Sequence, residues 1–127
     1  MKVLLDTHAL VWWMEDAVRL SKQAAQTIGN RENDILISAV VGWELAIKVS
    51  TGKMKPRSIL DGLDRVMERE PFLELPITLD TAVRSGLLPL HHRDPFDRLL
   101  VAQAQSLSVP ILSADAVFDL YDVKRLW

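Results

Sequence analysis

Short apolar runs alternate along the chain with longer segments in which apolar residues recur at helical spacing. The first run ends at Asp6 and is apolar on both faces, which predicts a strand buried on both sides. Strands are predicted at 2–5, 35–37, 72–75 and 109–112, with an edge strand at 123–126. Helices are predicted at 7–14, 22–28, 39–50, 58–69, 80–85 and 95–107, with a helical turn at 116–120. Because strands alternate with helices and hairpin dipeptides are absent, we expect an α/β fold with a parallel sheet between two helical layers.

Capping residues set the predicted helix boundaries. Ser21 and Ser38 stand where N-caps belong, and Asp94 followed by Pro95 is a strong helix start. Gly52 closes the helix that follows Ser38, and Pro71 ends the helix of residues 58–69.

Composition narrows the class of protein. The 127 residues fit a single domain, 1–127, and 49% hydrophobic residues are enough for a core. The chain has no cysteine, which excludes disulfides, thiolate metal sites and cysteine nucleophiles. The longest charge-free apolar run, 35–43, is about half a membrane span, and no signal peptide is evident, so we expect a cytoplasmic protein that does not enter the membrane.

Charge is polarised although the net charge is only −2. Eleven of the 17 acidic residues are Asp, a residue that favours caps, loop ends and metal sites. Five of them lie between Asp94 and Asp122 beside a single base, Arg98, whereas Lys48 to Arg57 holds four bases and no acid.

Four acids are predicted to gather at the carboxyl end of the sheet, where parallel α/β folds bind ligands. Asp6 ends the first strand, and Asp115 follows the strand of residues 109–112. Asp97 lies in the first turn of the helix that begins at Asp94-Pro95, and Glu44 lies inside an apolar helix. Each acid also has a purely structural interpretation: Asp6 and Asp115 as helix caps, Asp97 as a partner of the helix dipole and Glu44 paired with Lys48.

Convergence of these four acids would need a cation. Two carboxylates 4 Å apart repel by roughly 4 kcal/mol at an effective dielectric constant of 20. Mg²⁺ or Mn²⁺ prefers such oxygen ligands, and it can activate water for attack on a phosphodiester.

Four segments of the chain carry a family resemblance. VLLDTHALVWW, SAVVGWELAIKVSTGK, LPLHHRDPFDRLLVAQA and VPILSADAVF occur in this order between Val3 and Phe118. Together they resemble a PIN domain, and more narrowly the VapC-type toxin ribonucleases of toxin–antitoxin pairs.

The resemblance implies a three-layer α/β/α PIN-like fold with a short central parallel sheet, and cleavage of RNA that depends on Mg²⁺ or Mn²⁺. It places the catalytic, metal-binding acids at Asp6, Glu44, Asp97 and Asp115 and leaves Asp94 as the helix cap. Ser113 stands at a hydroxyl position of the family, and we expect Ser113, Thr7 and Arg98 to support the site. The implied partners are an RNA substrate, a cognate antitoxin protein and a second copy of the chain in a homodimer.

Other polar residues allow alternative interpretations. His91 and His92 are expected in a solvated loop, and His8 is near enough to Asp6 to touch RNA. Arg98 could steady a carboxylate, contact phosphate or pair with Asp94. The bases of 48–57 could grip the RNA backbone or form a solvated helix end.

Trp12, Trp13 and Trp43 are expected in the core, with one exposed Trp conceivable as a partner anchor.

A phosphoacceptor receiver domain lacks support because Thr7 and His8, rather than a second acid, follow Asp6. The alternative that stays open is a non-catalytic PIN-like module that binds protein or RNA.

Overall fold

A computed structural model describes residues 1–54 and 58–127 of the chain. The described residues form one parallel five-stranded sheet, in the spatial order β3-β2-β1-β4-β5. The strands are β1 (Lys2–Leu5), β2 (Asp34–Ser38), β3 (Leu73–Leu75), β4 (Ile111–Leu112) and β5 (Arg125–Leu126). The predicted α/β class with a central parallel sheet flanked by helices is confirmed.

The order of the strands creates a switch point in the middle of the sheet. The chain moves outward from β1 through β2 to β3, then returns to the other side of β1 to form β4 and β5. Leu5 of β1 pairs with Leu112 of β4 in register, so the carboxyl ends of these two strands lie together. In open parallel sheets, ligands bind at the crevice that forms at such a switch point.

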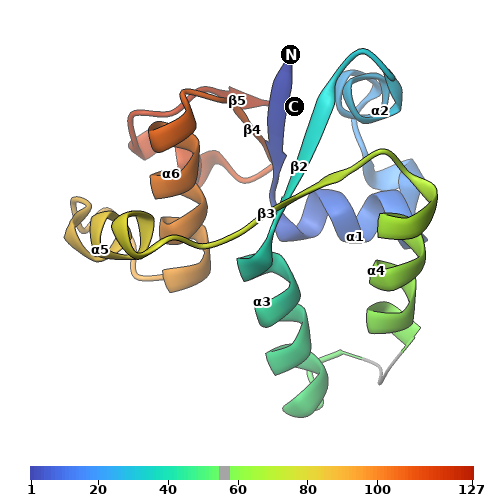
Figure 1. Cartoon of the computed structure of the whole chain (residues 1–127), viewed down its shortest axis with the longest axis horizontal. Coiled ribbons are helices and arrows are strands. Elements are labelled where there is room, and N and C mark those ends of the chain that lie inside the picture. The colour runs from blue at the N-terminus through green and yellow to red at the C-terminus, as the bar shows by residue number, and fades with distance from the viewer. Residues whose placement is uncertain (55–57) are drawn as a thin grey trace.

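Helices cover both sides of the central strands (Figure 1). In that view α5 and α6 lie on one side and α1, α2 and α4 on the other, while α3 extends from the end of β2. The bounds are α1 (Thr7–Glu15), α2 (Lys22–Gly29), α3 (Ala39–Ser50), α4 (Ser58–Arg69), α5 (Leu79–Leu87) and α6 (Pro95–Leu107). Short 3-10 helices occupy Ala17–Arg19 and Ala116–Leu120.

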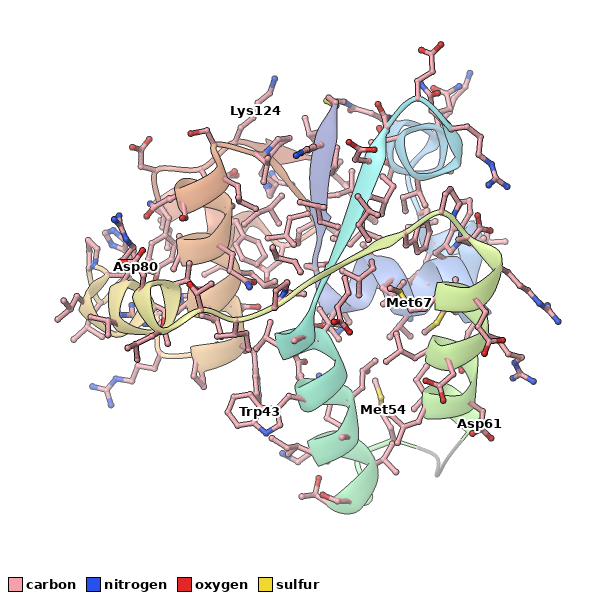
Figure 2. The ribbon with its side chains drawn as sticks, viewed as in Figure 1. Trp43, Met54, Asp61, Met67, Asp80 and Lys124 are labelled. Carbon is pink, nitrogen blue, oxygen red and sulfur yellow. The ribbon has the colours of Figure 1, made fainter. Side chains whose placement is uncertain are left out.

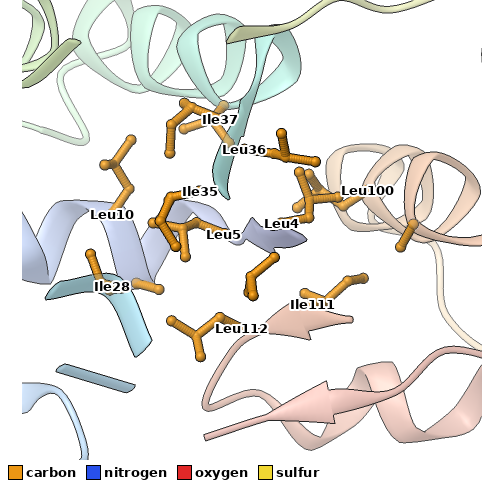
Figure 3. Close-up of a cluster of buried hydrophobic side chains, with 14 of the residues drawn as sticks. Leu4, Leu5, Leu10, Ile28, Ile35, Leu36, Ile37, Leu100, Ile111 and Leu112 are labelled. Carbon is orange, nitrogen blue, oxygen red and sulfur yellow. The ribbon is translucent and has the colours of Figure 1, made fainter. Parts of the chain in front are cut away.

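The core is built from strand side chains on both faces of the sheet (Figure 3). The apolar residues of β1, β2 and β4 are fully or almost fully buried, which explains the continuous apolar runs of these strands. Leu10 of α1 and Leu100 of α6 cover this cluster. The rigid centre therefore holds the ends of β1 and β4 in fixed positions.

Several boundaries differ from those expected. The strands at 109–112 and 123–126 are reduced to two residues each, because β4 and β5 pair only at Ile111–Arg125 and Leu112–Leu126. The segment that begins at Thr7 is helical from its first residue, since Asp6 caps it.

Among the described helices, none is long and apolar enough to cross a membrane.

Candidate active site

Asp6 and Ser113 join the carboxyl ends of β1 and β4. Oδ1 of Asp6 accepts a hydrogen bond from the backbone N–H of Ala9 at 2.7 Å, which caps α1. Oδ2 accepts from the Ser113 hydroxyl, whose oxygen in turn accepts from the N–H of Asp115 at 3.0 Å. Burial raises the pKa of the Asp6 carboxyl, the hydrogen bonds from Ser113 and Ala9 lower it, and the charge of Asp115 raises it slightly.

Asp115 lies beside this pair on a more open part of the surface. Its Oδ1 accepts from the N–H of Val117 at 2.9 Å and caps the 3-10 helix Ala116–Leu120. Its side chain is exposed, unlike the buried carboxyl of Asp6. The predicted capping roles of Asp6 and Asp115 are therefore both real, and Asp115 still adds negative charge beside Asp6.

Glu44 is a buried acid with two partners. Its Oε1 accepts from the Thr7 hydroxyl at 2.8 Å, and its Oε2 accepts from Lys48 Nζ at 2.6 Å. Only 6% of Glu44 is exposed, so the partners are needed to offset its desolvation. Thr7 is the first residue of α1 and directly follows Asp6, so its bond to Glu44 brings α3 against the end of β1.

Asp97 lies in the first turn of α6, beside the cap residue Asp94. Asp94 accepts from the N–H groups of Phe96 and Asp97, which confirms its predicted role as N-cap. Oδ2 of Asp97 lies 3.2 Å from His92 Nε2. Burial, followed by the charges of Asp94 and Glu44, raises the pKa of Asp97 to about 6, although the hydrogen bond from His92 lowers it.

An aromatic contact holds α6 against α3 at the site. The rings of Trp43 and Phe96 meet edge to face, with centroids 5.1 Å apart. The prediction that Trp43 is a core residue is wrong, because it is 55% exposed, and Figure 2 shows it to the left of α3, below the lower end of α6. Trp12 and Trp13 are partly buried and pack against the core. Trp43 thus belongs to the surface next to Glu44.

The chemistry of these donors fits a hard divalent cation, although they do not form a ready cage. The carboxylates offer oxygen ligands, and those of Asp6 and Asp97 have pKa values raised by burial and by neighbouring acids. A cation would relieve this concentration of negative charge. Within residues 1–54 and 58–127, no three His, Asp or Glu side chains are close enough to hold a metal ion. Each of the four acids accepts hydrogen bonds from the protein instead.

Arg98 bonds to backbone carbonyls and does not pair with Asp94, one of the partners considered for it from the sequence. Its guanidinium is buried and donates to the carbonyl oxygens of Ser85, Leu88 and Pro89 at 3.1, 2.9 and 2.8 Å. It forms no ion pair with a described carboxylate, Asp94 included. The planar fork of five donors suits a cluster of carbonyls, so Arg98 ties the loop after α5 to α6.

His92 contacts a candidate site acid, which the sequence did not lead us to expect. The expected solvated-loop position is wrong for His92, because its side chain is only 19% exposed and reaches Asp97. The signal that could have located it is its place in the loop just before the Asp94 cap, five residues ahead of a candidate site acid. His91 is exposed and contacts the ring of Tyr121, and His8 lies against Trp12.

The basic stretch of residues 48–57 is only partly visible. Lys48 pairs with Glu44 at 2.6 Å, as the structural interpretation of Glu44 predicted. Lys53 is exposed, and Lys55 and Arg57 lie outside the described residues. Lys48 of this stretch therefore pairs directly with Glu44, one of the candidate site acids.

Comparisons with known proteins agree on one family. A model of the PIN domain matches residues 3–124. Ribonuclease VapC22 of Mycobacterium tuberculosis is 31% identical over 104 residues, which span 80% of this chain and 78% of that protein.

Solved structures agree with this result at the level of the fold. A chain of VapBC2 from Rickettsia felis, bound to a promoter DNA fragment, superposes with a TM-score of 0.77 at 18% identity, over 99% of this chain and 98% of that one. A chain of the DNA-bound VapBC from Salmonella typhimurium gives 0.71 at 14% identity, over 99% and 97% of the two chains. Because the family model spans nearly all of the sequence, the chain belongs to the PIN domain family.

Proposed function

We propose that this PIN domain is a metal-dependent endoribonuclease that acts on RNA in the cytoplasm as the toxin of a toxin–antitoxin pair. The observation that carries the proposal is that the acids lie in two neighbouring pairs, which are linked because Thr7, directly after Asp6, donates to Glu44. The charge of Asp115 acts on Asp6, and the charge of Glu44 acts on Asp97. These residues come from four separate segments of the chain, and they sit where parallel sheets bind ligands. The 31% identity to a ribonuclease supports RNA as the substrate class.

In this proposal the four acids hold Mg²⁺ or Mn²⁺ and an RNA phosphodiester is hydrolysed by in-line attack of water. The bound cation would lower the pKa of its water and offset the negative charge of the phosphate. Ser113 orients Asp6, while Thr7 and Lys48 orient the two oxygens of Glu44. The carboxylates are therefore held by neighbours with locked positions, as an active site requires.

Substitution of single acids tests the proposal. Asp6→Asn or Asp97→Asn should reduce RNA cleavage in Mn²⁺ by about 100-fold or more while the protein stays folded, because each removes a charged ligand and preserves side-chain shape. Cleavage of a labelled RNA is measured beside the circular dichroism melting curve. EDTA should abolish cleavage by the wild-type protein, and excess Mn²⁺ should restore it.

Asp61→Asn is the matched control. Asp61 is an exposed acid in the first turn of α4, and its label in Figure 2 lies on the outer side of that helix. The control should cleave at the wild-type rate. Full activity of Asp6→Asn would contradict the proposed site, and RNA binding without cleavage by the wild-type protein would instead favour the non-catalytic module.

Two protein partners form part of the proposal. The solved relatives are toxin–antitoxin complexes, some of them bound to DNA, so we expect an antitoxin partner here as well. Co-expression with a small DNA-binding protein from a neighbouring reading frame should yield a stable complex in which RNA cleavage is inhibited. The second partner is another copy of the chain. The exposed side chains of Leu79, Val83 and Leu87 form an apolar stripe on α5, which a homodimer would cover.

A further inference from the structure

A chain of hydrogen bonds leads from the interior of the protein to Asp97. His92 Nε2 lies 3.2 Å from Oδ2 of Asp97, and His92 Nδ1 lies 2.7 Å from the hydroxyl of Tyr121. Arg98 donates to the same hydroxyl from a distance of 3.2 Å. Tyr121 and Arg98 are each only 6% exposed, so this network is shielded from water at its inner end.

The direction of each bond follows from the donors and acceptors available. An ionised Asp97 carboxylate only accepts, so the proton of a neutral His92 must sit on Nε2. Nδ1 is then a bare acceptor and takes the hydroxyl proton of Tyr121. The Tyr121 oxygen accepts from Arg98, which can only donate. With Asp97 ionised and His92 neutral, this one arrangement satisfies all three contacts at once.

Arg98 also fixes the backbone that carries His92. Its guanidinium donates to Leu88 and Pro89 in the loop between α5 and α6, and more weakly to the carbonyl of His92 itself at 3.5 Å. The loop has no regular secondary structure between 88 and 94 that could hold it. One buried cation thus anchors both the loop and the hydroxyl that orients the imidazole.

We propose that His92 is a positioning residue for Asp97, held in the Nε2–H tautomer by Tyr121 and Arg98. The function of this network rests on the proposed metal-dependent activity, in which one oxygen of Asp97 is fixed by the imidazole. Partners that orient a metal ligand affect metal affinity by about 10–100-fold. The tautomer itself is a property of the metal-free protein and is tested separately.

Nitrogen-15 NMR of the histidine rings at pH 8 tests the tautomer. The chain has three histidines, so variants at His8 and His91 assign the signals. Wild-type His92 should carry its proton on Nε2, and Tyr121→Phe should move the Nδ1 signal toward that of a nitrogen without a donor. A proton on Nδ1 in the wild type, or an unchanged Nδ1 signal in Tyr121→Phe, would overturn the proposed network.

Calorimetric titration with Mn²⁺ tests the consequence of the network. His92→Phe should weaken Mn²⁺ binding by about 10-fold or more, and His92→Gln, which keeps an N–H donor, should recover part of the loss. Tyr121→Phe should weaken Mn²⁺ binding by a smaller factor than His92→Phe. The variant protein should stay folded, since only a hydroxyl is removed. His91→Phe is the matched control, because His91 is exposed and forms no side-chain hydrogen bond within the described residues; it should bind as the wild type does.

The outcomes separate this inference from the proposed function. If Asp6→Asn and Asp97→Asn lose Mn²⁺ binding but the His92 and Tyr121 variants keep wild-type affinity, the positioning role is wrong and the metal site stands. If the Asp6 and Asp97 variants bind Mn²⁺ like the wild type, the proposed metal function itself fails. Melting curves for every variant distinguish loss of positioning from loss of fold.

Discussion

Three of the four acids of the candidate site also have a structural role. Asp6 and Asp115 cap helices, and Glu44 pairs with Lys48. A carboxylate has about four lone-pair positions, so a cap or an ion pair leaves capacity for a ligand. The structural interpretation of these residues is therefore compatible with the proposed metal site.

Ionisation of Asp97 lowers the stability of the native state, and a substitution that removes the charge should remove this loss. Its pKa is raised from 3.8 to about 6, so the native state binds this proton more tightly than the unfolded chain does. Stability is therefore lost as the pH rises from 3.8 to 6, and the loss persists above 6. Asn resembles the protonated form of Asp97. Above pH 6.5 the free energy of unfolding of Asp97→Asn should therefore exceed that of the wild type by about 1 kcal/mol.

Urea unfolding in EDTA between pH 3.5 and 8 measures this difference. The advantage of Asp97→Asn should vanish near pH 3.5, where the carboxyl is protonated in both states. A difference that is constant with pH would show that the ionisation of Asp97 is not its source. If Asp97→Asn is more stable than the wild type and inactive, it follows the common pattern in which active-site residues lower the stability of the protein.

Elements with strong local signals could be predicted well from the sequence. The α6 helix begins at Pro95 as expected because Asp94 supplies the cap and Pro95 fits the first turn. The bounds of β4 and β5 could not be predicted, since their ends depend on which partner residues are in register. Thr78 caps α5 in a capping box with Thr81, which lacks the usual Glu or Gln and gives a weaker signal.

The contacts of the site depend on packing between elements and were harder to foresee. Asp6, Asp97 and Asp115 could be selected because each stands at or just after a predicted strand end or in the first turn of a predicted helix. Glu44 could be selected because it is an acid inside an apolar helix. His92 and Arg98 could not be placed, because the carbonyls and the Tyr121 hydroxyl that they contact come from distant turns. The apolar residues around Trp43 in the sequence predict a core position, although more than half of the residue is exposed and its ring packs edge to face on Phe96.

The cap of α6 can be separated from its charge by two substitutions at Asp94. Asp94→Asn keeps an oxygen that accepts from the N–H groups of Phe96 and Asp97, whereas Asp94→Ala loses it. We expect Asp94→Ala to lower the free energy of unfolding by about 1 kcal/mol and Asp94→Asn to change it little. Urea denaturation at pH 7 in EDTA compares the two variants. Equal destabilisation of both would mean that the charge of Asp94, rather than its cap bonds, stabilises the helix.

At the scale of the whole molecule, strand order assembles a site from residues distant in sequence. Asp6 and Ser113 lie 107 residues apart and meet because β1 and β4 are neighbours at the switch point. The same arrangement places α5 and α6 together on one side of the central strands (Figure 1). The outer surface of α5 is then left without cover in the single chain.

That outer surface of α5 should form the interface of a homodimer. Leu79, Val83 and Leu87 recur every four residues and are 83%, 53% and 80% exposed, so they form one straight apolar stripe. A stripe along one helix can pack on its own copy across a two-fold axis, which places the same patch on both partners. Light scattering after gel filtration should give twice the 14.4 kDa of one chain.

Substitution in the stripe should separate the two copies without unfolding either. Leu87→Glu places a charge within the proposed interface, where burial without a partner is costly, so the mass should fall to 14.4 kDa. Val18→Glu is the matched control, because Val18 is 94% exposed and lies outside α5; this variant should remain dimeric. A monomeric wild type, or a Leu87→Glu dimer as stable as the control, would exclude α5 as the interface.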